Sequence, residues 1–192
     1  SRKQYSFDST KVKGIKQTAR QSIEKCGTRA TKQLIIALEN ADDDLKECII
    51  QIFGNIKDSS TLPILVKFAS EYVGPYQGDA ILSLSKFGTE GVSHLYGLLN
   101  KVEDYMKGRL ILAIASTKCK EANEILKMLL TSPEYILRKY AVEGIGANNY
   151  TEYEDELIRL LDDKLINEQV VESLGKLKST KALERIIATR TK

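Results

Sequence analysis

The side chains that most often bind metals or act as nucleophiles are few in this chain. His94 is its single histidine, and Cys26, Cys48 and Cys119 stand far apart without a CxxC pair. Because a zinc site needs a cluster of such ligands, the sequence predicts no bound metal. We expect His94 to be a surface residue, since its neighbours supply the apolar side of their segment. We expect Cys26 to be packed in the core as a small apolar side chain.

Motifs of nucleophilic catalysis and of nucleotide binding are absent from the sequence as well. It contains no GxSxG, no GxxxxGK[ST] and no GxGxxG. Gly144 and Gly146 have the spacing of two motif glycines, but they end a helical pattern instead of following a strand. The four carboxylates of residues 152–156 fit a solvated helix start, where negative charge is stabilised by the helix dipole. We therefore predict that the chain has no catalytic residues and needs no cofactor.

Composition and cysteine usage favour a soluble protein of the cytoplasm. The chain is 42% hydrophobic and 29% charged, and three scattered cysteines do not form a disulfide framework. No apolar run approaches the roughly 18–20 residues that cross a membrane, and no signal peptide is visible. Charge is uneven, because residues 1–33 hold nine lysines and arginines against two acidic residues. This basic end is a solvated helix or, as an alternative, a contact for nucleic acid or an acidic protein.

Apolar residues recur every 29 to 31 residues along the chain, and this repeat dominates the sequence. Relative to an anchor in each unit, the residues four before and four after are apolar in all six units. Such positions share one face of an α-helix. The residues three and five after the anchor are small in most units, where a neighbouring helix must come close. The anchors are Ala19, Ile49, Ala80, Leu110, Ala141 and Val170.

A second apolar segment follows each anchored helix after a short turn. Each unit is therefore predicted to be a helical hairpin. One hairpin cannot bury its apolar face alone, whereas stacked hairpins can. The sequence predicts an all-α fold, an α-α superhelix or solenoid of about six hairpins, forming one domain over residues 1–192. The second segments are residues 34–38, 62–69, 92–99, 122–130, 156–161 and 182–188.

The repeat resembles HEAT repeats, in the short form of phycobilin-lyase-type HEAT-like proteins. The second helix of that family reads apolar–basic–x–x–small–apolar–x–small–Leu–Gly, and residues 137–146, LRKYAVEGIG, match it closely. The resemblance implies that the basic residue three before the anchor pairs with acidic turn residues of the same or the next unit. Lys46, Lys107 and Arg138 occupy this position, whereas Gln77 and Asn167 interrupt it.

Proteins with HEAT-like repeats have several functions, and each needs residues that can be looked for in this sequence. A di-iron hydroxylase of the deoxyhypusine type needs several His-Glu pairs, and one histidine excludes that site. A nucleic-acid-binding protein of the DNA-glycosylase type needs a basic concave groove with aromatic side chains. This chain has no tryptophan, and acidic residues such as Glu47 and Glu143 fall on the exposed side of the anchored helices. Nucleic acid binding is therefore the less favoured alternative, beside a lyase-like accessory subunit.

The favoured prediction is a non-catalytic scaffold that binds another protein or a peptide on its concave side. The anchored helices should line that side, with positions five before, two before and two after the anchor exposed. These positions are polar in most units but hold Pro75, Gly78, Leu82, Tyr105, Gly108 and Leu112 in the two middle units. The glycines indicate close approach by another chain, or helices that start late. The predicted partner-binding residues are Leu82, Leu112, Tyr105, Arg109 and Tyr140; alternatively, the two leucines pack between units.

Overall fold

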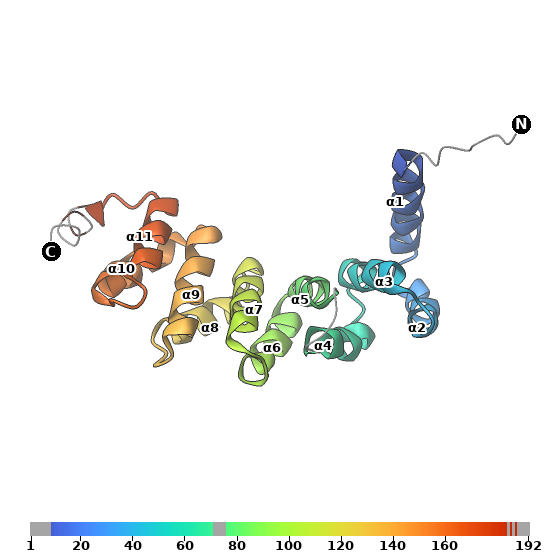
Figure 1. The fold of residues 1–192 in the computed structure, drawn as a ribbon, viewed down its shortest axis with the longest axis horizontal. Coiled ribbons are helices and arrows are strands. Elements are labelled where there is room, and N and C mark those ends of the chain that lie inside the picture. Colours follow the sequence, from blue (N-terminus) through green and yellow to red (C-terminus); the bar gives the residue numbers. More distant parts are fainter. Residues whose placement is uncertain (1–8, 71–75, 184, 186, 188–192) are drawn as a thin grey trace, which may run out of the picture.

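The computed structural model describes residues 9–70, 76–183, 185 and 187, and within this part every regular element is helical. The helices form two rows along an elongated, bowed stack (Figure 1). The inner row lies on the concave side and holds α1 (Ser9–Lys25), α3 (Asp43–Ile56), α5 (Gln77–Ser85), α7 (Asp104–Ser116), α9 (Tyr135–Ala147) and α11 (Asn167–Lys176). The outer row holds α2 (Thr31–Glu39), α4 (Leu62–Ser70), α6 (Thr89–Leu98), α8 (Lys120–Leu130) and α10 (Glu154–Arg159).

The predicted superhelix of helical hairpins is thus confirmed. Each anchor lies on an inner helix, and inner helices contact one another in chain order from α1 to α11. Five outer helices alternate with them among the described residues. Of the sixth predicted second segment, residues 184, 186 and 188 lie outside the described residues, as does Pro75.

Local signals in the sequence set where the helices begin and end, as α3 illustrates. The Asp42 carboxylate accepts a hydrogen bond of 2.8 Å from the backbone N–H of Leu45, which satisfies one of the free donors of the first turn. Asp43 and Asp44 place further negative charge at that positive helix end. The helix ends at Lys57, whose φ of 57° breaks the helical path and starts the turn to the outer row.

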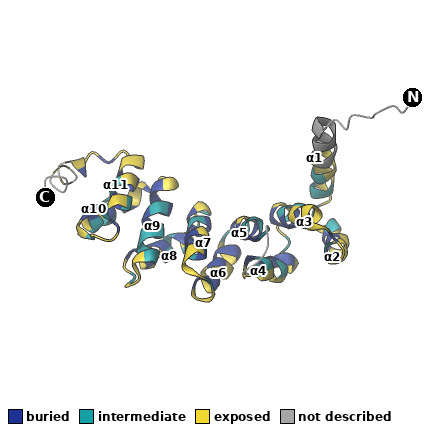
Figure 2. Cartoon of the chain, in the orientation of Figure 1, coloured by how far each residue is buried: buried dark blue, intermediate teal, exposed yellow. Residues whose placement is uncertain are grey.

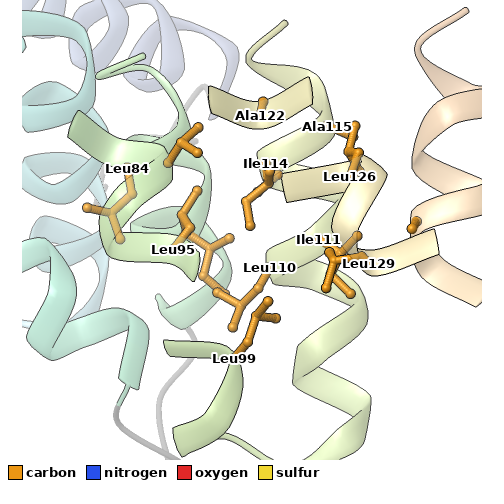
Figure 3. Packing of buried hydrophobic residues seen from close by; sticks show 14 of the residues in the cluster. Leu84, Leu95, Leu99, Leu110, Ile111, Ile114, Ala115, Ala122, Leu126 and Leu129 are labelled. Carbon is orange, nitrogen blue, oxygen red and sulfur yellow. The ribbon is translucent and has the colours of Figure 1, made fainter. Parts of the chain in front are cut away.

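One continuous hydrophobic cluster runs along the stack from Leu34 to Ala182. Its side chains come from both rows, as Figure 3 shows for Leu84, Leu95 and Leu110 of three successive helices. From α2 to α11, every helix carries both buried and exposed residues (Figure 2). Burial between the rows is the main favourable term that holds such a stack together.

Five of the six anchors are at most 1% exposed, but the equivalence predicted for the first one is wrong. Ala19 is exposed. It belongs to α1, which lies at the end of the described stack and projects away from it (Figure 1). Cys26, which directly follows the same helix, is also exposed, against the expectation of burial. The repeat pattern marks Ala19 as inward-facing, but burial also requires a neighbour on each side of the helix.

The small residues of the repeat lie where inner helices touch, as the sequence predicted. The residue five after one anchor meets the residue three after the next, so closely that a methyl group added to the glycine would stand 2.6–2.8 Å from its partner. Ser83 and Ser173 also donate buried hydrogen bonds to carbonyls of the preceding inner helix, at 2.9 and 3.0 Å. The close pairs are Gly54 with Ser83, Ala115 with Gly144, and Gly146 with Ser173.

The basic position of the repeat forms the predicted ion pairs. The Lys107 ammonium lies 2.9 Å from Asp104 in its own unit and 2.9 Å from Glu134 in the next. These two hydrogen bonds raise the pKa of Lys107, outweighing the effect of burial. Arg138 likewise reaches the next unit, where its guanidinium lies 2.8 Å from Asp163, a partner not predicted from the sequence. The basic position of the repeat therefore joins neighbouring units, through Lys107 and Arg138.

A candidate partner-binding surface on the inner helices

Polar side chains connect the first three inner helices across the concave side. The Arg20 guanidinium of α1 donates to the Gln51 side-chain oxygen of α3, and the Gln51 amide donates to the Asp79 carboxylate of α5 at 2.8 Å. Gln51 stands two residues after its anchor and Asp79 one residue before the next anchor. This pair of positions therefore faces across the contact between neighbouring inner helices.

A second polar connection runs beside the first. Asn55 of α3 donates to the Glu24 carboxylate of α1 at 2.6 Å, and the Lys86 ammonium donates to the Asn55 side-chain oxygen at 2.7 Å. Burial raises the pKa of Glu24, but hydrogen bonds from Arg20 and Asn55, together with nearby positive charge, lower it overall. Each of these polar groups is paired within the chain.

In the next two units this polar pairing stops, because leucine takes the position that Gln51 holds. Leu82 of α5 precedes Arg109 of α7, and Leu112 of α7 precedes Tyr140 of α9, in the same relative positions as Gln51 and Asp79. Leu82 is 54% exposed, Arg109 is exposed, and Leu112 and Tyr140 are half-buried.

We call Leu82, Tyr105, Arg109, Leu112 and Tyr140 the concave patch. All five lie on three successive inner helices, and Tyr105, at the start of α7, is 52% exposed. Leu112 is the least available of the leucines, since its Cδ2 lies 3.8 Å from where a Cβ on Gly144 would stand. The structure thus places the five predicted residues on neighbouring helices and leaves Leu82 and Tyr105 as the most exposed apolar members.

Two glycines form the floor beneath the patch. A Cβ on Gly108 would lie 2.5 Å from the Tyr140 ring, so the ring rests directly on the backbone of α7. A Cβ on Gly78 would lie 3.7 Å from Nη1 of Arg109, so the guanidinium lies beside the first turn of α5. The expectation that Gly108 admits another chain is therefore wrong, because Tyr140 of the same chain fills that space.

The charge around the patch is mixed. Positive charge lies at its centre, where Arg109 is exposed and the Lys139 ammonium stands 5.6 Å from the centre of the Tyr140 ring. Acidic residues lie on either side along the inner row, including the exposed Glu47 on α3 and Glu172 on α11. Exposed acidic residues of the inner row therefore lie on both sides of the patch.

Two apolar hollows lie away from the concave patch and were not foreseen from the sequence. One, of about 460 Å³, lies among α1, α2 and α3 and is lined by residues such as Ile23, Leu34 and Leu45. The other, of about 470 Å³, lies between α2 and α4. The sequence contains one signal for the hollow beside α1. Arg20 follows the first anchor, whereas isoleucine or valine follows the anchor in the other five units.

The described residues were also searched for metal-binding groups and for helices that could cross a membrane. His94 is exposed on α6, as predicted. Within the described residues, no three histidine, cysteine or acidic side chains are grouped so that they could hold a metal ion. No helix in the described ranges combines the length and apolar character needed to cross a membrane.

Comparison with protein families identifies the repeat. A family model described as HEAT repeats matches residues 122–191, which span most of α8, then α9, α10 and α11. Residues 122–191 thus contain HEAT repeats, and hairpins of the same kind stack along the rest of the described chain. HEAT repeats generally form extended concave surfaces that serve as protein-interaction scaffolds. No curated protein matches the chain. The finer resemblance to phycobilin-lyase-type HEAT repeats stays a prediction.

Proposed function

We propose that this HEAT-like protein is a non-catalytic scaffold or adaptor that binds another protein or a peptide on the concave patch. The observation that supports it most is the change of side-chain chemistry along one row. Gln51 of α3 is half-buried and hydrogen-bonded to Asp79, whereas Leu82, at the corresponding position of α5, is 54% exposed, and Tyr105 at the start of α7 is 52% exposed. Exposed apolar and aromatic side chains of this kind are typical of interaction sites.

The proposal includes a single repeat domain and a cytoplasmic location. The continuous core from Leu34 to Ala182 supports the first. Three free cysteines support the second, since reducing compartments keep thiols unpaired.

Photo-cross-linking in cells of the source organism tests the proposed surface. Leu82 or Tyr105 is replaced by p-benzoylphenylalanine, and the adducts are separated by mass. Tyr96, which is 38% exposed on the outer helix α6, provides a matched control for the opposite row. We expect one adduct of the same mass from positions 82 and 105 but not from position 96, and we expect Leu112→Asp to abolish it.

Adducts that form equally from position 96, or that survive Leu112→Asp in a folded protein, would overturn the proposal. Circular dichroism of Leu82→Asp and Leu112→Asp provides the folding control. Leu82→Asp should change the free energy of unfolding by no more than about 0.5 kcal/mol, because the side chain is largely exposed.

Duplex DNA binding, the alternative, is tested in the same preparation by a salt titration. The exposed acidic residues of the inner row oppose a phosphate backbone, so we expect no useful affinity at physiological salt. Tight binding with a steep dependence on salt concentration would favour the nucleic-acid function instead.

A further inference from the structure

One polar group of the concave patch, the Arg109 guanidinium, has no acceptor among the described residues. In the preceding unit, the Gln51 amide of α3 donates a hydrogen bond of 2.8 Å to the Asp79 carboxylate of α5. Where Leu82 stands, no such bond to Arg109 can form, because leucine has no acceptor. The guanidinium carries five N–H donors and stays charged at any physiological pH.

Arg109 lies in the same part of the inner row as the apolar side chains of the patch. The guanidinium lies beside the bare backbone at Gly78, and the Tyr140 ring lies on the backbone at Gly108, the residue directly before Arg109. Leu82 lies on the preceding inner helix, and Leu112 lies on the same helix as Arg109. The patch therefore combines an exposed positive group with apolar side chains.

Charge along the inner row limits where a partner can carry negative charge. Lys139 adds a second positive group next to Tyr140. Glu47 lies on α3, Asp79 lies on α5 and accepts a hydrogen bond from Gln51 of α3, and Glu143 lies on α9 three residues after Tyr140. A carboxylate at the centre of the patch is attracted, whereas carboxylates further along either side meet like charges.

We propose, as a deepening of the proposed function and resting on it, that the partner is a peptide segment with one central aspartate or glutamate between apolar side chains. The carboxylate accepts hydrogen bonds from the Arg109 guanidinium, in the bidentate geometry that arginine favours. The apolar neighbours contact Leu82 and Leu112. Basic residues further out in the segment match the acidic residues on both sides of the patch.

A random-peptide display library tests this chemistry directly. Twelve-residue peptides are selected against the wild-type protein, and the affinity of the enriched peptides is measured by fluorescence anisotropy. We expect a central acidic residue between apolar residues. Arg109→Gln should weaken binding about tenfold, since a hydrogen bond to a charged group is lost. Replacing the acidic residue of the peptide by its amide should weaken wild-type binding similarly and Arg109→Gln binding little.

The outcomes separate the two proposals. Selected peptides that lack an acidic residue and bind Arg109→Gln normally, but fail to bind Leu82→Asp and Leu112→Asp, would overturn the charge inference and leave the binding surface standing. Selected peptides that bind both leucine variants normally, or a library that yields no binder, would overturn the proposed surface itself. Arg109→Lys serves as the conservative control and should recover part of the affinity, because it keeps the charge but not the bidentate geometry.

Discussion

Gly54 offers a sharp test of how neighbouring inner helices meet. A methyl group added by Gly54→Ala would lie 2.7 Å from Cα, Cβ and Oγ of Ser83 on the next inner helix. Carbon atoms pack best at about 3.5–4.0 Å, so α3 and α5 must separate by about 1 Å. Rotation of the Ser83 side chain cannot relieve the contact, because one of the three atoms belongs to the backbone.

The two opposing effects of Gly54→Ala can be given rough sizes. Alanine is favoured over glycine inside a helix by about 0.5–1 kcal/mol. Forcing an extra carbon into a filled contact costs about 1–3 kcal/mol. We therefore expect the variant to lose about 1–2 kcal/mol of unfolding free energy, although most exposed helical glycines gain stability from the same change.

Gly175 provides the matched control, because it holds the same position of the repeat in α11. A Cβ there meets no atom within 4 Å. Gly175→Ala should therefore raise the free energy of unfolding by about 0.5–1 kcal/mol. Urea denaturation followed by circular dichroism measures both variants. If Gly54→Ala were as stable as the wild type or more stable, the close contact between α3 and α5 would be incorrect.

Three other substitutions test single interactions. Ser83→Ala removes the buried hydrogen bond to the Ile50 carbonyl and should cost about 1 kcal/mol in urea denaturation; no loss would contradict that bond. Tyr150→Phe removes the 2.8 Å hydrogen bond to the Ala115 carbonyl and should cost a similar amount; burial raises the pKa of Tyr150 to about 12, so the loss should be constant from pH 6 to 9. The pKa of Glu24 is lowered by its partners, so its stabilising effect is present above its unfolded pKa and disappears as the pH falls. The stability difference between wild type and Glu24→Gln should therefore begin to shrink near the unfolded pKa of about 4.3 and disappear as the pH falls through the lower folded pKa in thermal unfolding, and a difference independent of pH would be the contrary result.

The repeat itself was predictable, because helix periodicity and the 29- to 31-residue spacing act on every unit alike. The position of a residue within its unit predicts whether it is an anchor, a small residue at a helix contact or the basic residue of an ion pair. The resemblance to HEAT repeats implies that the basic position pairs with an acidic turn residue, and Lys107 pairs with Glu134 in this way. The first unit was less predictable, since the exposure of Ala19 depends on which helices lie beside α1 and not on its own sequence.

The concave patch was predicted as a set of residues but not as an arrangement. Which position of one unit faces which position of the next depends on how neighbouring helices cross, and the sequence does not state that offset. The hydrogen bond from Gln51 to Asp79 shows which two positions meet, and the same offset pairs the position of Leu82 with that of Arg109. The role of Gly108 was misjudged for the same reason, because the ring that fills its space comes from Tyr140, 32 residues further along the chain.

Hydrogen–deuterium exchange with a library-selected peptide tests most directly whether a partner occupies the inner row. We predict slower exchange at the solvent-facing start of α7 and along α5 and α9 when the peptide is bound, with α6 and α8 unchanged. Protection confined to the outer helices, or to the hollow between α2 and α4, would contradict the proposed binding surface.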